Sequence, residues 1–118
     1  STKQVQIYIP AGATLEARIM TNSPKQQKVY LYNNSGLFYS WLGSGEGKQI
    51  GYQTVKVPEG GTTWNVDVEF KSGTIWRWAK VFPTGWSSNG SGLKTYVVAD
   101  DLDDADFNDA VVALSYTI

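Results

Sequence analysis

The sequence predicts an all-β fold, a single-domain antiparallel β-sandwich of about nine strands. Apolar and polar residues alternate with a period of two in several short stretches, which is typical of strands with one solvent-facing side. Turn-forming residues separate these stretches at intervals of about 8 to 12 residues, a spacing typical of sandwiches. No stretch of ten residues shows the period of an amphipathic helix. The length of 118 residues suits one domain with a sizeable core.

Eight stretches are expected to form most of the strands. The clear alternations are residues 5–9, 15–19, 28–32 and 53–57. The further expected strands are residues 63–70, 74–82, 93–99 and 110–116. Clusters of glycine, proline, serine and asparagine mark the expected turns at residues 10–12, 33–36, 43–47, 58–61, 72–73 and 87–92. Residues 110–114 are apolar throughout, so we expect this strand to be buried on both faces.

Composition excludes several classes of function. The chain has no cysteine and no histidine, so disulfides, thiolate-bound zinc, imidazole metal sites and the Ser-His-Asp triad are all absent. An enzyme is therefore not expected. A pI near 5.2 without a basic stripe argues against nucleic-acid binding. No apolar run approaches 18 residues, so we expect a soluble protein without membrane insertion; a secreted or surface-associated location is compatible with this, but the sequence does not indicate a compartment.

Six of the eleven acidic residues lie within residues 100–109. The remaining five acids are outnumbered by ten Lys and Arg, so the chain divides into a positive body and a strongly negative loop. At about 4 Å, each like-charged pair costs roughly 1 to 4 kcal/mol, depending on the local dielectric. A compensating cation is therefore expected. Asp and Asn oxygens without His or Cys favour calcium over zinc or copper.

The spacing of Asp104, Asp106 and Asn108 resembles the opening of an EF-hand loop, but the rest does not fit. An EF-hand needs glycine at its sixth position and glutamate at its twelfth, and these positions hold Asp109 and Ser115. Five or more carboxylates also exceed what one calcium ion requires. We therefore expect two calcium ions that share bridging carboxylates.

Two motifs resemble a known family. The string Asp104-Ala-Asp106-Phe-Asn108-Asp109-Ala-Val-Val is similar to the D-x-D-Y-N-D-A-V-V signature of the LecB-type (PA-IIL-like) calcium-mediated fucose- and mannose-binding lectins. Near the N-terminus, residues 9–11 (Ile-Pro-Ala) and 22–23 (Asn-Ser) resemble the L-P-A and N-S elements of that family, at the same mutual spacing. About half of the chain carries the resemblance, and the tryptophan-rich centre does not.

The resemblance implies a lectin with two calcium ions in one site, ligated directly by sugar hydroxyls. The implied calcium ligands are Asn22, Asp100, Asp104, Asp106, Asn108 and Asp109. The implied sugar-binding residues are Ser23, Pro24, Lys25, Asp101 and Asp104. In this scheme Asn22 ligates through its main-chain carbonyl or amide oxygen, Asp100 replaces a family Glu, and Asp101 binds sugar hydroxyls. The loop at residues 23–25 discriminates fucose from mannose, and Ser23 resembles the fucose-preferring members.

The family resemblance also implies a homodimer or a higher homo-oligomer. In the family, the C-terminal carboxylate of a partner subunit completes the site after a W-P-L-G-like ending, whereas this chain ends Ser115-Tyr116-Thr117-Ile118. The principal alternative is a structural or adhesive calcium-binding β-sandwich module without free-sugar binding. A glycosidase would instead need two carboxylates that flank a scissile bond.

The tryptophans and two acidic residues in the centre of the chain are explained by ordinary structural roles. Trp76 and Trp78 alternate, so both rings are expected on one side of a strand, in the core or at an interface. Trp41 and Trp86 lie beside glycine-rich segments and are better candidates for exposure. Residues 67 and 69 are both acidic and share one strand face, where pairing with Lys or Arg across the sheet is the default expectation.

Overall fold

The computed structural model describes residues 4–88, 92–100 and 109–118, which form nine β-strands joined by turns. The strands are β1 (Gln4–Tyr8), β2 (Thr14–Asn33), β3 (Phe38–Lys56), β4 (Thr63–Ser72), β5 (Ile75–Trp78), β6 (Lys80–Pro83), β7 (Ser87–Ser88), β8 (Leu93–Asp100) and β9 (Ala110–Thr117). Neighbouring strands pair antiparallel throughout these residues. The all-β prediction and the expected number of strands are confirmed.

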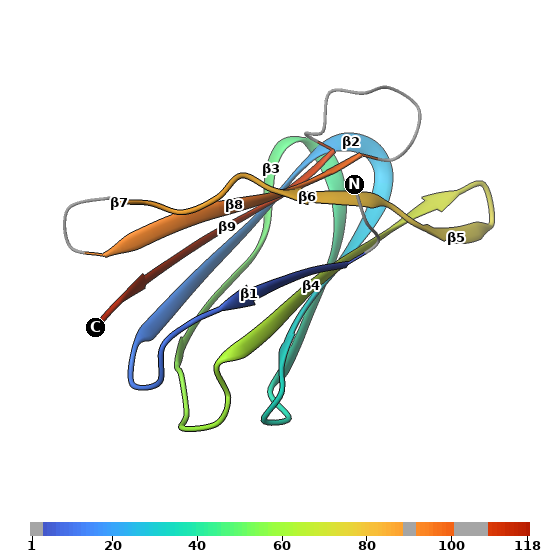
Figure 1. Cartoon of the computed structure of the whole chain (residues 1–118). Helices are drawn as coiled ribbons and strands as arrows, with labels where there is room; N and C mark the ends of the chain where they lie inside the picture. The colour runs from blue at the N-terminus through green and yellow to red at the C-terminus, as the bar shows by residue number, and fades with distance from the viewer. Residues whose placement is uncertain (1–3, 89–91, 101–108) are drawn as a thin grey trace.

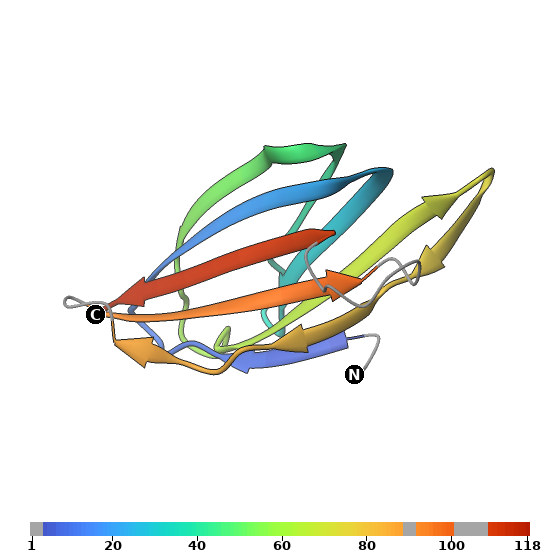
Figure 2. The ribbon, with the colours of Figure 1, turned by 90° about the horizontal axis from the view of Figure 1, so that it is seen from above.

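The strands form one hydrogen-bonded sheet that folds over on itself as a sandwich. Its main order is β1-β4-β2-β9-β8-β6, while β3, β5 and β7 pair with β2, β4 and β8. Figure 1 shows the strands crossing the molecule side by side, and Figure 2 shows the sheet curling so that β2 and β3 lie opposite β1 and β6. Strands β1 and β6 approach each other and nearly close the sheet. The first layer contains β1, β4, β5 and residues 27–33 of β2, and the second contains β6 to β9 and residues 14–21 of β2. The two layers enclose the core.

Strands β2 and β3 each belong to both layers. The first part of β2, residues 14–21, pairs with β9, and its last part, residues 27–33, pairs with β4. The separate strands that the sequence predicted at residues 15–19 and 28–32 are therefore one strand with a bend. The pairing of β2 with β3 shifts register between Thr21 and Ser23 and again between Ser23 and Gln27. Such irregularities bend a strand and increase its twist.

Glycines in β3 accommodate this bend, and they misled the turn prediction at residues 43–47. A Cβ at Gly43 would collide with Ile50, and one at Gly51 would collide with the ring of Trp41. Gly45 has a φ of 125°, in the region that favours glycine. The glycine cluster therefore marks a bend and close packing within one strand, and not a connection between two strands.

The strand predicted at residues 74–82 is also divided. Strand β5 pairs with β4, whereas β6 pairs with β8 in the other layer. Ala79 lies between them, is buried, and donates its backbone N–H to the carbonyl of Val68 at 2.9 Å. The chain crosses between the layers here, which a run of alternating residues does not reveal.

The core consists of the inward-facing side chains of both layers. Trp64, Phe70, Leu15, Ile19 and Leu31 are among the largest side chains that are almost completely buried. Strand β4 alternates buried and half-buried residues along most of its length, as a strand with one core face should. No helix long and apolar enough to cross a membrane occurs among the described residues.

Three expectations for apolar residues differ from the structure. Strand β9 alternates buried with half-buried residues over its first six positions, so its outer face is not fully buried as its apolar sequence predicted. Trp78 is 44% exposed, so it does not belong to the core, whereas the other expected environment, an interface, remains a prediction. Trp41, expected to be exposed, packs against the core, whereas Trp86 is exposed as predicted. Apolar composition alone does not distinguish these environments.

Candidate functional site

Three segments that are far apart in the sequence meet at the bend of β2. The backbone N–H of Asn22 donates to the carbonyl of Asp109 at 3.0 Å, and the N–H of Asp109 donates to the carbonyl of Ala99 at 3.1 Å. Asp100 is the last residue of β8, and β9 begins directly after Asp109. Figure 1 shows the bend of β2 and β3 beside these strand ends. The structure thus brings together three predicted ligands, Asn22, Asp100 and Asp109.

Hydrogen bonds within the bend and to β3 hold the segment that follows Asn22. The hydroxyl of Ser23 accepts a bond from the backbone N–H of Lys25 at 3.1 Å. The side-chain amide of Gln27 donates to the carbonyl of Lys25 at 3.3 Å, and the hydroxyl of Thr21 donates to the carbonyl of Gly45 at 3.0 Å. Ser23 and Gln27 are buried, while Pro24 between them is exposed. This segment therefore has a buried base, and Pro24 is exposed on its outer side.

Strand β3 supports the loop from the other side. The side-chain oxygen of Asn22 accepts a bond from the backbone N–H of Gly47 at 2.8 Å. Gly47 has a φ of 57°, a left-handed conformation that favours glycine. Residues Thr21, Gln27 and Gly47 are supports that the sequence analysis missed. The glycines of β3 could have indicated a bend in that strand. No sequence pattern predicts that Gln27 is buried.

We call the place where the bend of β2 meets the end of β8 and the start of β9 the joint. Its two acidic residues are buried. Asp100 is 5% exposed and Asp109 is 4% exposed. Burying a carboxylate is costly unless hydrogen bonds, an opposite charge or a metal ion compensate it. Both residues lie at the ends of the acidic loop. The predicted residues Asp101, Asp104, Asp106 and Asn108 lie outside the described residues, and the described part alone contains no cluster of three or more acids that could hold a metal ion.

The remaining predicted residue, Lys25, is half-buried. Its Nζ lies 5.4 Å from the centroid of the Phe70 ring, a geometry that suits a cation–π contact. Phe70 belongs to β4, so the loop after Asn22 is attached to the layer opposite β9. Residues 22–25 consequently contact both halves of the sandwich.

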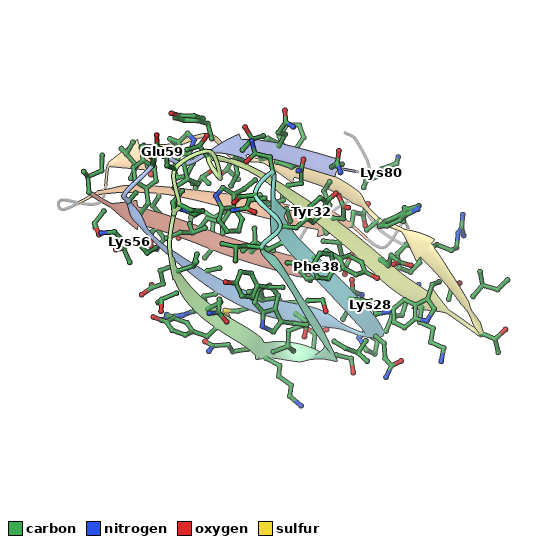
Figure 3. All side chains as sticks on the ribbon, turned by 90° about the horizontal axis from the view of Figure 1, so that it is seen from below. Lys28, Tyr32, Phe38, Lys56, Glu59 and Lys80 are labelled. Atoms are coloured by element: carbon green, nitrogen blue, oxygen red, sulfur yellow. The ribbon has the colours of Figure 1, made fainter. Side chains whose placement is uncertain are left out.

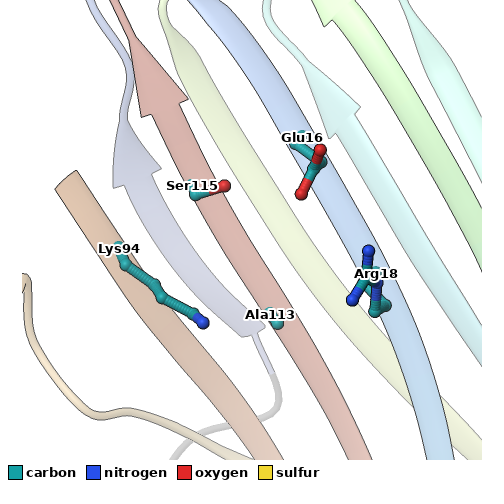
Figure 4. A pocket seen from close by; sticks show the side chains of 5 residues that line it. All are labelled: Glu16, Arg18, Lys94, Ala113 and Ser115. Atoms are coloured by element: carbon teal, nitrogen blue, oxygen red, sulfur yellow. The ribbon is translucent and has the colours of Figure 1, made fainter. Parts of the chain in front are cut away.

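A small polar cavity lies on the outer face of the second layer, away from the bend. Its volume is about 140 Å³, and Glu16, Arg18, Lys94, Ala113 and Ser115 line it. Figure 4 shows Lys94 and Arg18 on opposite sides, with the small Ala113 leaving space between them. The hydroxyl of Tyr52 donates to Glu16 at 2.7 Å. The cavity includes none of the predicted ligands.

Aromatic side chains cover the outer face of the first layer. The ring centroid of Tyr30 lies 6.3 Å from that of Trp78 and 6.0 Å from that of Phe38, and Phe38 lies 5.8 Å from Tyr32. Figure 3 shows Tyr32 and Phe38 together on the adjacent strands β2 and β3. With Asp67, these four rings line a shallow cavity of about 230 Å³. We call this set the aromatic face.

Among the described residues, Asp67 and the neighbouring Glu69 accept hydrogen bonds from tyrosines and form no ion pair with Lys or Arg, contrary to the expectation from sequence. Tyr32 donates its hydroxyl to Oδ2 of Asp67 at 2.9 Å, and Tyr30 donates to Glu69 at 2.5 Å. Within the described residues, Oδ1 of Asp67 is shielded from solvent and has no hydrogen-bond partner. A buried polar atom without a partner costs about 1 to 3 kcal/mol.

Burial, together with the hydrogen bond to Glu69, raises the pKa of Tyr30 to about 12 from its ordinary 10.0. The folded state holds this proton more tightly than the unfolded chain. The resulting stabilisation is complete below about pH 10 and is lost as the pH rises to about 12. We expect Tyr30→Phe to remove the latest step of the tyrosinate absorbance titration and to reduce the alkaline loss of stability. Tyr8→Phe, at an exposed position, is the control and should leave that step in place.

The fold of the chain is similar to that of three solved lectins. The lectin CV2L of Chromobacterium violaceum, solved in complex with alpha-methyl-fucoside, superposes with a TM-score of 0.75 at 18% identity over 96% of each chain. The high-affinity mannose-binding lectin of Ralstonia solanacearum gives 0.74 at 16% identity, again over 96% of each chain. The C-terminal domain of the BC2L-C lectin of Burkholderia cenocepacia gives 0.69 at 14% identity, over 96% of this chain and 95% of that one. At these identities the likeness shows the fold alone.

The family follows from the sequence. The family model of fucose-binding lectin II (PA-IIL) matches residues 7–118. The chain therefore belongs to the fucose-binding lectin II family, which confirms the resemblance seen in its motifs and supports carbohydrate binding. No curated protein matches the chain by sequence.

Proposed function

We propose that this protein is a calcium-dependent lectin, in which an acidic loop holds two calcium ions that bind the hydroxyls of a fucose- or mannose-type sugar. The observation that carries the proposal is the joint at the β2 bend. There, Asn22 is hydrogen-bonded to the backbone of Asp109, and Asp100 and Asp109 stand at the two ends of the acidic loop. Family membership supplies the sugar class.

The donor set suits calcium. Carboxylate and amide oxygens are the ligands that calcium prefers, and the chain contains no His or Cys to favour a softer metal. The buried positions of Asp100 and Asp109 give a bound cation a direct role in compensating their charge. The proposed ligands are Asn22, Asp100, Asp104, Asp106, Asn108 and Asp109.

The protein's own residues would fix the sugar's orientation. The hydroxyl of the buried Ser23 accepts a hydrogen bond from the backbone N–H of Lys25, so contacts within the chain hold this segment in shape. Pro24 and Lys25 then offer a proline ring and a half-buried aliphatic stem to the sugar, which we infer to be the selective surface. Asp101 and Asp104 are proposed to accept hydrogen bonds from sugar hydroxyls.

The same chemistry argues for binding without turnover. A glycosidase needs one carboxyl group with a raised pKa to act as general acid. A carboxylate that ligates calcium has the opposite tendency, because the cation favours its ionised form. The protein is therefore proposed to be a lectin and not a hydrolase.

We also propose a homodimer or a higher homo-oligomer. Single sugar sites are weak, and linked sites raise avidity by about 10² to 10⁴. In the family that the sequence resembles, a partner's C-terminal carboxylate completes the site.

Isothermal titration with the methyl glycosides of L-fucose and D-mannose tests the proposal, first in calcium and then after chelation with EDTA. Saturable heat that disappears in EDTA is expected, with the fucoside binding more tightly. Calcium binding without sugar heat would instead indicate a structural calcium module. Stability alone does not separate these outcomes, since a hundredfold excess of calcium over its Kd stabilises either by about 2.7 kcal/mol.

A further inference from the structure

A buried glutamine lies directly after residues 23–25, which we call the selective segment because the proposed sugar site would use them to distinguish sugars. Gln27 is polar, yet it is 0% exposed. The pairing of β2 with β3 passes directly from Ser23 to Gln27, and the pairing of β2 with β4 begins at Gln27. Gln27 is therefore the residue at which β2 resumes regular pairing with both neighbours after the bend.

The side chain of Gln27 holds the backbone of Lys25. Its amide nitrogen donates to the carbonyl of Lys25 at 3.3 Å. The backbone N–H of Lys25 donates to the hydroxyl of Ser23 at 3.1 Å. Both backbone polar groups of Lys25 are thus bound by side chains, one before it in the sequence and one after it. In a regular strand, the backbones of neighbouring strands make such bonds. In this segment, the side chains of Ser23 and Gln27 make them.

One atom of the Gln27 side chain is unsatisfied. Its oxygen Oε1 is shielded from solvent and, within the part of the chain that the structure describes, has no hydrogen-bond partner. Reversing the amide would not help, because two oxygen atoms would then meet at the carbonyl of Lys25. A buried polar atom without a partner destabilises a fold, so an apolar side chain of similar length would suit this position better for stability alone. Departures of this kind are expected at functional sites.

Other contacts hold the two ends of the segment. The backbone N–H of Asn22 donates to the carbonyl of Asp109, and the side-chain oxygen of Asn22 accepts from the N–H of Gly47. The Nζ of Lys25 lies 5.4 Å from the centroid of the Phe70 ring. These contacts do not involve Gln27. Its hydrogen bond therefore acts on the backbone of the selective segment and not on Asn22, the neighbouring calcium ligand that we propose.

We propose that Gln27 is a positioning residue that determines the sugar selectivity of the site, an inference that rests on the proposed lectin function. Gln27 is not proposed to touch the sugar. It fixes the carbonyl of Lys25, and through it the positions from which Pro24 and Lys25 face the sugar. Binding groups must be held to within about 0.5 Å, which requires hydrogen bonds from the residues behind them. Loss of this bond should therefore change the difference in affinity between fucoside and mannoside.

Gln27→Met tests this role, first without any sugar. Methionine has a similar length and is apolar, so it removes the donor and the unsatisfied oxygen together. In EDTA, we expect hydrogen exchange of the Lys25 backbone amide to become about tenfold faster or more, because the segment opens locally. The free energy of unfolding should change little, since one hydrogen bond and one unsatisfied atom are lost at once.

Calorimetry in calcium with methyl fucoside and methyl mannoside then measures selectivity. Gln27→Met should weaken sugar binding by about tenfold and change the ratio of the two affinities by about threefold or more. Its calcium affinity should match that of the unmodified protein. Thr95→Val is the matched control, because Thr95 is a buried polar residue of β8 away from the bend and valine has the same shape. It should leave both the exchange of the Lys25 amide and the affinity ratio unchanged.

Two outcomes would overturn the role of Gln27 alone while the unmodified protein still binds fucoside. One is an unchanged affinity ratio in Gln27→Met. The other is a loss of sugar binding accompanied by an equal loss of calcium affinity and stability, which identifies a merely structural residue. Absence of sugar heat from the unmodified protein would instead overturn the proposed lectin function, and the selectivity role with it.

Discussion

Replacing Asp109 with Asn is expected to lower calcium affinity about a hundredfold or more and to abolish fucoside binding with it. The substitution keeps the size of the side chain and removes one negative charge. The backbone of Asp109, which accepts from Asn22 and donates to Ala99, is unchanged, so the joint should persist. Calorimetry with calcium and then with methyl fucoside measures both losses on the same sample.

The stability of this variant in EDTA should be no lower than that of the unmodified protein. Without calcium, Asp109 is one of several carboxylates in a short loop, and removing one relieves repulsion. Glu59→Gln is the control, since Glu59 is an exposed acid in the turn before β4. It should bind calcium and sugar normally. Retained fucoside binding in Asp109→Asn would contradict the proposed ion site.

Replacing Trp64 with Ala is expected to reduce the free energy of unfolding by about 3 to 5 kcal/mol. Trp64 is the largest of the fully buried side chains, and it pairs with Ile7 of β1 and Asn33 of β2. Truncation would leave a large cavity between the layers. Since natural domains are stable by only about 5 to 15 kcal/mol, this variant is expected to unfold close to its working temperature.

Trp64→Phe should be far milder. Within the described residues, Nε1 of Trp64 is buried without a hydrogen-bond partner, so phenylalanine removes a polar group that nothing satisfies. This gain partly offsets the smaller ring. Denaturant unfolding of both variants in EDTA measures the difference. A loss for Trp64→Phe as large as that for Trp64→Ala would show that Nε1 has a partner after all.

The fold class could be predicted from sequence because alternation and turn chemistry are local properties. How the strands connect and pair could not be predicted in the same way. The bend at residues 22–26 depends on how β2 pairs with three different strands, and no local pattern encodes that. The division at Ala79 likewise depends on which layer each neighbour joins. The exposure of Trp78 and the packing of Trp41 against the core follow from how β5 and β3 pair.

The candidate site was more predictable than its supports. The acidic residues, Asn22 and residues 23–25 were predicted as site residues because their chemistry and order resemble a family motif, and their roles remain predictions. The hydrogen bonds of Thr21, Gln27 and Gly47 were not found, since each depends on contacts across the bend. Asp67 was assigned an ordinary cross-strand pairing because its tyrosine partner becomes adjacent only in the folded sheet.

The position of the joint affects the order in which parts of the protein can fold during synthesis. Strand β2 is synthesised early, but its partner β9 is the last strand of the chain. The contact between Asn22 and Asp109 can therefore form only after almost every other strand has been made. During synthesis, β1 to β5 can pair with one another, whereas the acidic loop between β8 and β9 has not yet been made. Sugar recognition at the bend would thus be acquired in a single late step, when β9 docks between β2 and β8.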